Sequence, residues 1–191
     1  MIEWLENIDR ILFLWLNGFH NDFFDAFFWC VTSKYFGLPF YAIVIWMLIR
    51  KYGWKTGAIL IIGAILSVAL SDLSSNHLFK NIFLRYRPGY NLEIGDQVHN
   101  LIVEGARYRG KIDASFLSAH AANMFAIATF VGFSLNRKVL WIGFLVAALI
   151  GYSRIYIGVH YPADICCGSI LGLFLGWLMY RFFSNLLTLS K

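Results

Sequence analysis

The chain has 191 residues, of which 59% are hydrophobic and only 14% are charged. A soluble domain carries roughly 25% charged residues, and the mean hydropathy here is +0.63, so an ordinary soluble domain is excluded. A membrane barrel is also excluded, because its strands alternate apolar and polar residues and the apolar runs here are continuous. The net charge is +5, but the basic residues lie at the ends of apolar segments, which favours anionic lipid over nucleic acid as a partner.

Residues 2–18 mix apolar and charged side chains at helical spacing. The apolar positions include Trp4 and Trp15, a residue type suited to the headgroup zone of a bilayer. We therefore expect an amphipathic helix that lies in the membrane interface, with its charged residues on the polar face. The start of the chain lacks the basic region and cleavage site of a signal peptide, so we expect the N-terminus to be retained.

Five apolar segments follow this helix. The first, residues 23–49, is interrupted by Asp25, Lys34 and Pro39, and is either one kinked span or a short helix followed by a longer one. The others begin near residue 57 and then cover residues 116–135, 139–153 and 165–180. Each uncharged run of about 15–20 residues approaches the length that crosses a bilayer core. The sequence predicts an all-α, polytopic membrane helical bundle of five to six transmembrane helices, forming a single domain over residues 1–191.

Counting these spans brings three charged segments to one face of the membrane. They are residues 80–88 after the second span, 116–120 before the third, and 153–164 between the fourth and fifth. The opposite face receives a second basic group: Arg50, Lys51, Lys55, Arg137, Lys138 and Arg181. By the positive-inside rule that second face is cytoplasmic, so we expect the three charged segments to face outward.

The first charged segment carries two cations in register. Lys80 and Arg87 are seven residues apart, which is two turns of a helix and places them on one face. Arg85 lies between them and off that face, and Pro88 ends the helix. Two cations directed at one point suit a phosphoryl group, to which arginine offers a planar fork. The alternative is a basic signal that ends a membrane span.

The second segment, Phe116-Leu117-Ser118-Ala119-His120, places small residues before a helix. Small residues let backbone N–H groups reach an anion, and a helix N-terminus favours negative charge. Ser118 suits the N-cap position, and His120 suits proton donation to a leaving alkoxide. The alternative for a single interfacial histidine is a structural role.

The third segment, residues 153–164, contains Arg154, His160 and Asp164. The last two are four residues apart and meet if a helix begins near Pro162, a residue that favours the first helical turn. A carboxylate that holds one imidazole nitrogen leaves the other as a nucleophile of fixed tautomer. Although a charged helix cap is the alternative for this segment alone, the three segments together predict a site that handles phosphate at a membrane surface.

The order of these residues resembles the tripartite signature of the type 2 phosphatidic acid phosphatase superfamily. The signature consists of Lys80, six residues, Arg87-Pro88; Ser118-x-His120; and Ser153-Arg154, five residues, His160, three residues, Asp164. The resemblance covers about residues 57–180. The middle motif departs from it, since the family usually has Pro-Ser-Gly-His where this chain has Leu117-Ser118-Ala119-His120. Alanine adopts a positive φ less readily than glycine, so the backbone at Ala119 has to suit an ordinary residue.

The resemblance implies a bundle with six membrane helices and a reaction that needs no metal and no other cofactor. His160 would attack phosphorus and become a phosphohistidine, Asp164 would orient it, and His120 would protonate the leaving oxygen. The phosphoryl oxygens would be held by Lys80, Arg87, Ser118, Ala119 and Arg154. The three cysteines lie in apolar stretches without a CxxC pattern, so the residues themselves predict neither a metal site nor a disulfide framework.

We therefore expect a phosphatase of a membrane lipid phosphate or diphosphate, in the bacterial inner membrane with its site facing the periplasm. Residues 117–123 look similar to bacterial members assigned to undecaprenyl diphosphate, which makes this lipid the first candidate substrate. Lipid A, phosphatidylglycerol phosphate and phosphatidic acid are the alternatives within the family. Two alternatives of another class are a lipid phosphotransferase and a lipid-binding or transport protein without activity. Asp72, in the polar end of the second span, is a candidate partner for one of the cations.

Overall fold

The computed structural model describes most of the chain, namely residues 2–33, 35–79, 82–83, 85–103, 106–110, 112 and 115–187. Lys80, one of the predicted phosphate ligands, lies outside the described residues. The helices are α1 Ile2–Asn17, α2 Asp22–Thr32, α3 Leu38–Leu73, α5 Ala119–Leu135, α6 Arg137–Tyr156 and α7 Pro162–Leu186. The shorter elements are the π-helical turn η1 Ser74–Phe79, the 3₁₀ turns η2 Pro88–Tyr90 and η3 Gly95–Gln97, and the antiparallel strands β1 Ile102–Val103 and β2 Ala106–Arg107.

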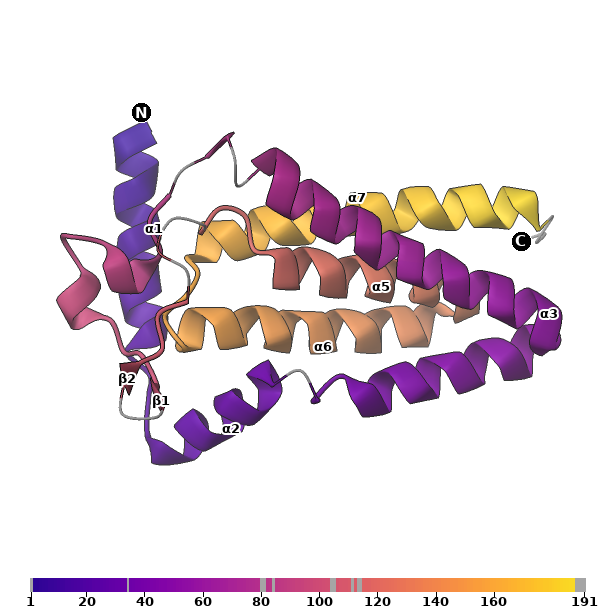
Figure 1. Cartoon of the computed structure of the whole chain (residues 1–191), viewed down its shortest axis with the longest axis horizontal. Coiled ribbons are helices and arrows are strands. Elements are labelled where there is room, and N and C mark those ends of the chain that lie inside the picture. The colour runs from indigo at the N-terminus through magenta and orange to yellow at the C-terminus, as the bar shows by residue number, and fades with distance from the viewer. Residues whose placement is uncertain are drawn as a thin grey trace.

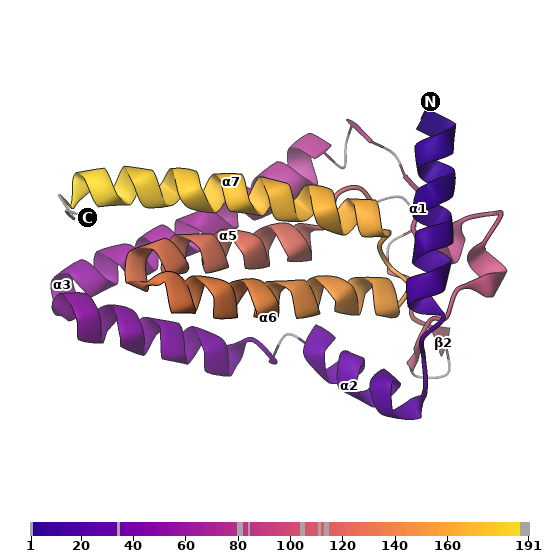
Figure 2. The ribbon, with the colours of Figure 1, turned by 180° about the vertical axis from the view of Figure 1, so that it is seen from behind.

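The long helices α3, α5, α6 and α7 lie side by side along the length of the molecule (Figures 1 and 2), and α1 stands across one end of them. The start of α5, the end of α6 and the start of α7 all lie at the end that α1 covers. The second and third charged segments therefore meet at one end of the bundle, as the count of spans predicts. The connection that contains η2, η3 and the two strands covers the same end.

A glycine folds α3 back on itself. Gly53 has φ 75° and ψ 171° in the middle of α3, a left-handed conformation that favours glycine. The two legs of α3 on either side of it meet at a turn at the end of the bundle opposite α1 and diverge from there toward the α1 end (Figure 1). Residues 23–49 thus hold the short helix α2 followed by the first leg of α3, which begins at a proline-containing turn. This is one of the two arrangements that the sequence left open.

Length and hydropathy identify the helices that suit a bilayer. Among the described residues, three helical segments are long and apolar enough to span a membrane, Leu38–Phe79, Arg137–Tyr156 and Pro162–Leu186, and α5 is a shorter apolar helix. The all-α membrane bundle is confirmed. The amphipathic helix is also present as α1, with Trp4 65% and Trp15 61% exposed. One expectation about it is wrong, because Asp9, expected on the polar face, is only 7% exposed and packs against the bundle.

A row of glycines sets α7 directly against α5. Gly168, Gly172 and Gly176 occur at every fourth position and face α5. A Cβ atom at these positions would lie 2.5 Å from the carbonyl oxygen of Ser118, 2.2 Å from that of Ala122 and 2.4 Å from that of Ala126, respectively. Small residues at this spacing let two membrane helices approach closely. The close approach brings the start of α5 to the start of α7, where the backbone N–H of Ser118 donates to the carbonyl oxygen of Asp164 at 3.1 Å.

Two asparagines secure the turn between α6 and α7. The Nδ2 atom of Asn17 donates to the carbonyl oxygens of Ile155 at 3.1 Å and Tyr156 at 2.8 Å. Asn100 donates in the same way to the carbonyl oxygen of Ile157 at 3.1 Å. The last carbonyl groups of a helix have no partner within the helix itself, so these amides satisfy the end of α6 while fixing α1 and the long connection against it. The turn that leads to His160 is thereby held from two sides.

Candidate active site

A buried histidine–aspartate pair stands at the start of α7. His160 is the second residue before the helix and Asp164 lies in its first turn, with exposed fractions of 3% and 0%. The Nδ1 atom of His160 lies 3.5 Å from Oδ2 of Asp164, a close contact that does not reach hydrogen-bond geometry. Pro162 begins α7, and the Asp164 carboxylate accepts the backbone N–H of Tyr161 at 2.9 Å. The contact that the four-residue spacing predicts is therefore present.

The carboxylate of Asp164 is fully engaged by donors. Its Oδ1 atom accepts from Nη1 of Arg85 at 2.9 Å, and its Oδ2 atom accepts from the hydroxyl of Ser115. A buried carboxylate is costly unless it is paired and hydrogen-bonded, and these donors offset that cost. Asp164 is consequently held as an anion in a fixed orientation beside the imidazole.

Arg85 connects this carboxylate to a second one. Its Nη2 atom lies 2.7 Å from Oδ2 of Asp9, and its guanidinium carbon lies 3.9 Å from the centre of the Tyr161 ring. The other oxygen of Asp9 accepts the backbone N–H of Ala163 at 2.9 Å. The sequence interpretation placed Arg85 off the face that Lys80 and Arg87 would share in a helix, but residues 85–87 are not helical and Arg85 touches Asp164 directly. Asp9 and Ser115 were missed altogether, since no motif or spacing distinguishes them.

The arginines of the first and third motifs act on the same imidazole. Arg154, in the last turn of α6, is 6% exposed, and its buried Nε atom has no hydrogen-bond partner among the described residues. Burial lowers the pKa of His160 below its ordinary value, the charges of Arg87 and Arg154 lower it further, and Asp164 opposes both effects. Two positive charges thus face a histidine whose imidazole is neutral near pH 7, the form in which a ring nitrogen can attack an electrophile.

Arg87 is itself fitted closely into the connection that precedes η2. Its backbone N–H donates to the carbonyl oxygen of Ile112 at 3.3 Å. Gly110, with φ 69°, lies so near that a Cβ atom there would stand 2.5 Å from Nη1 of Arg87. The guanidinium therefore occupies space that only a glycine leaves open.

The second motif forms the start of α5, as predicted. Ser118 is the N-cap residue and its hydroxyl accepts the backbone N–H of Ala121 at 3.5 Å. Ser118 and Ala119 are buried, whereas the His120 side chain is exposed. Ala119 is the first residue of α5, so its backbone is right-handed helical, a conformation that alanine favours. The departure from the family's Pro-Ser-Gly-His motif therefore introduces no strained backbone here.

Asp72 has two amide donors. Its Oδ1 atom accepts from Nδ2 of Asn123 at 3.0 Å and its Oδ2 atom from Nδ2 of Asn76 at 2.9 Å. These donors are amides and not cations, but Lys80 lies outside the described residues, so the role of Asp72 as a partner of a cation stays a prediction. The carboxylate joins the end of α3 to α5 one turn beyond His120.

Comparison with known proteins establishes the family to which the chain belongs. Residues 52–187 match the profile of the PAP2 superfamily, so the chain belongs to this family, as the sequence resemblance predicts. Its members are hydrolases of phosphate esters, and this protein is a lipid phosphatase of a membrane.

Three members of the comparison, two by sequence and one by structure, are similar to most of the chain. The chain is 36% identical to a lipid A 4'-phosphatase of Bacteroides thetaiotaomicron, over 94% of this chain and 79% of the relative. It is 30% identical to the undecaprenyl-diphosphatase BcrC of Bacillus subtilis, over 85% and 77% of the two chains. The crystal structure of Aquifex aeolicus LpxE superposes with a TM-score of 0.68 at 29% identity, covering 89% of this chain and 93% of that one.

Proposed function

We propose that this lipid phosphatase removes a phosphate group from lipid A. The observation that carries the proposal is the 36% identity to a lipid A 4'-phosphatase over 94% of the chain, against 30% to an undecaprenyl-diphosphatase over 85%. The comparison thus favours lipid A, an alternative in the sequence interpretation, over undecaprenyl diphosphate, its first candidate. The motifs themselves bind phosphate and do not distinguish between the two lipids.

In the proposed reaction the Nε2 atom of His160 attacks phosphorus. A phosphorus–nitrogen bond forms as the bond to the leaving oxygen breaks, and His120 donates a proton to that oxygen. Water then attacks the phosphohistidine, His120 accepts its proton, and the phosphorus–nitrogen bond breaks to release inorganic phosphate. The buried Asp164 beside Nδ1 supports this assignment, because it favours the tautomer with a free Nε2 and stabilises positive charge on the ring.

The proposed phosphate cradle is built from the arginines and the start of α5. Arg87 and Arg154, whose charges both act on His160, would bind the phosphoryl oxygens together with Lys80. The Ser118 side chain and the backbone at Ala119 would complete the cradle at the N-terminus of α5, which favours an anion. Fixed positive charge around a phosphoryl group is the main source of transition-state stabilisation in such transfers.

We also propose five membrane crossings in one domain spanning residues 1–191. The first crossing is broken, formed by α2 and the first leg of α3; the second leg, α5, α6 and α7 are the others. The basic residues around Gly53, at the start of α6 and near the end of α7 lie at the end of the bundle opposite the site (Figure 1). The positive-inside rule then directs the site to the outer side of a bacterial inner membrane.

A phosphate-release panel tests the substrate. The purified protein in mixed micelles is offered lipid A, undecaprenyl diphosphate, phosphatidylglycerol phosphate and phosphatidic acid, each with and without EDTA. We expect the highest kcat/KM on lipid A and unchanged rates in EDTA, because a histidine nucleophile needs no metal-bound water. Preference for another lipid would overturn the substrate assignment, strict dependence on a divalent metal would overturn the mechanism, and transfer of phosphate to an added labelled alcohol would indicate a phosphotransferase.

The lowered pKa of His160 predicts a pH-dependent contribution to stability. The unfolded chain binds a proton at this residue near pH 6.5, whereas the folded protein does so only at lower pH. The free energy of unfolding that His160 contributes is therefore complete above pH 6.5 and lost as the pH falls toward the folded value, by at most about 1.4 kcal/mol per pH unit. Unfolding of the wild type and His160→Gln is compared from pH 7.5 to 5; the difference must shrink toward acid, and a constant difference would contradict the expectation.

A further inference from the structure

Two residues that are not part of the tripartite signature are connected to the histidine–aspartate pair through side chains alone. We propose that Asp9 and Arg85 are positioning residues for the reaction and that they tie the pair to the interfacial helix α1. The inference rests on the proposed function, because it takes His160 and Asp164 to be the reacting pair.

The first step is the geometry of the connection. Arg85 uses Nη2 for Asp9 at 2.7 Å and Nη1 for Asp164 at 2.9 Å, and the other oxygen of Asp164 faces His160. A guanidinium is planar and rigid, so its contact with one carboxylate fixes the direction in which it meets the other. The Tyr161 ring supports its face at 3.9 Å. Asp9 thus determines how Arg85 meets Asp164.

The second step is charge. Burial raises the pKa of the Asp9 carboxyl, while Arg85 and the N–H of Ala163 oppose this effect. Burial works against the charge of Arg85 too, but Asp164 and Asp9 outweigh it and raise the pKa of the guanidinium. One cation is therefore shared between two carboxylates. Because Asp9 takes part of its charge, Asp164 keeps more of its own for the imidazolium that forms when His160 transfers phosphate.

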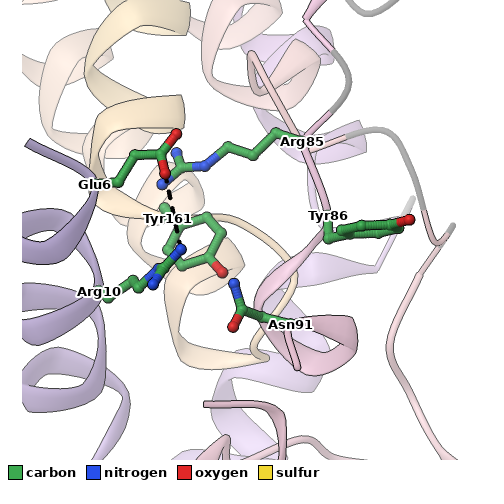
Figure 3. Close-up of a pocket in the computed structure, with 6 residues that line it drawn as sticks. All are labelled: Glu6, Arg10, Arg85, Tyr86, Asn91 and Tyr161. Carbon is green, nitrogen blue, oxygen red and sulfur yellow. Dashed lines mark ion pairs between the residues drawn. The ribbon is translucent and has the colours of Figure 1, made fainter. Parts of the chain in front are cut away.

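The third step is the space around Arg85. A pocket of about 160 Å³ opens beside it, lined by Glu6, Arg10, Arg85, Tyr86, Asn91 and Tyr161 (Figure 3). Glu6 and Arg10 project from α1 toward Arg85 and Tyr161 in this view. Without Asp9, the guanidinium has both the room and another carboxylate, that of Glu6, to draw it away from Asp164. Asp9 holds Arg85 in place against this movement, because its own carboxylate is fixed to the first turn of α7 by the backbone N–H of Ala163.

The test is Asp9→Asn, which keeps the shape of the side chain and removes its charge. We expect kcat on lipid A to fall about 10-fold, which is about 1.4 kcal/mol, with KM changed less than twofold, since Asp9 is coupled to Asp164 through one intervening residue. Glu3→Gln removes an equal charge from an exposed position of α1 and should keep the wild-type kcat. Tyr152→Phe removes the hydrogen bond that the Tyr152 hydroxyl of α6 donates to the carbonyl oxygen of Leu16 in α1 at 3.2 Å. It weakens the attachment of α1 without touching the carboxylates, so it should lower the unfolding temperature but leave kcat within twofold.

A double-mutant cycle separates positioning from packing. Arg85→Lys keeps a positive charge but not the fork that meets two carboxylates, and should also lower kcat about 10-fold. Because Asp9 acts through Arg85, the double variant should match Arg85→Lys alone; multiplied losses would overturn the proposal, as would a wild-type kcat in Asp9→Asn. If Asp9→Asn does not fold, a wild-type kcat in Arg85→Lys overturns the proposal. Failure of the wild type on every lipid phosphate would instead refute the proposed function.

Discussion

His160→Ala is expected to lower phosphate release from lipid A by about 10³-fold or more, because removal of a nucleophile leaves only the binding groups to assist the reaction. The side chain is almost fully buried, so no neighbouring group takes its place at the phosphorus. The arginines that face it remain, and KM should change far less than kcat. The measurement is initial-rate phosphate release in mixed micelles, together with acid-quench trapping of ³²P on the protein, which should vanish in the variant.

A second histidine provides the control. His20 is exposed and stacks on His99 with ring centres 3.9 Å apart, away from the contacts of Asp164. His20→Ala should release phosphate at the wild-type rate and still trap ³²P. Phosphate release at an unchanged rate by His160→Ala would show that another residue attacks phosphorus.

Local spacing made the third motif predictable. The spacing of four positions from His160 to Asp164, with Pro162 to begin the helix, determines their contact through helix geometry alone. The N-cap role of Ser118 is equally local, since it depends only on where α5 begins. Counting the spans added information on tertiary structure, because it placed these segments at one end of the bundle.

Arg85 and Asp9 could not be found in the same way. Arg85 is separated by 76 residues from Asp9 and by 79 from Asp164 in the sequence. Span counting gives the membrane face on which a residue lies but not the direction in which its side chain points. Asp9 is one acid among several on an amphipathic helix, and only the packing of α1 against α7 distinguishes it. The break in residues 23–49 was undecided for a similar reason: Pro39 suits either a kink or a helix start.

We expect the preference for one lipid over another to depend on the whole chain and not on the motifs alone. In the proposed mechanism the residues of the tripartite signature serve the transfer of the phosphoryl group, which lipid A and undecaprenyl diphosphate share. The 36% identity to a lipid A 4'-phosphatase extends over 94% of the chain, so it includes α1 and the long connection between α3 and α5. Those segments lie at the end of the bundle that holds the site (Figure 1), so in the proposed function they would meet the lipid headgroup.

Gly172→Ala is expected to destabilise the protein by about 3 kcal/mol, at the upper end of the usual cost of overpacking. A Cβ atom at this position would lie 2.2 Å from the carbonyl oxygen of Ala122 and 3.0 Å from the backbone nitrogen of Ala126. Both atoms belong to the backbone of α5, which cannot rotate away as a side chain does, so α7 must move as a whole. For a chain of this size the loss corresponds to about 6–12 °C in unfolding temperature.

The displacement should also reach the active site, because the same helix contact positions Asp164. The N–H of Ser118 bonds the carbonyl oxygen of Asp164 at 3.1 Å one turn before the glycine row begins, so separation of α5 and α7 there shifts the pair relative to the arginines. Gly151→Ala in α6 is the matched control, since its Cβ atom would meet only a methyl group of Ile165 at 3.0 Å. We expect a wild-type unfolding temperature and kcat for Gly151→Ala, and a loss of both for Gly172→Ala. An unchanged unfolding temperature in Gly172→Ala would mean that the α5–α7 contact tolerates the added methyl group, and an unchanged kcat would mean that this contact does not set the geometry of the site.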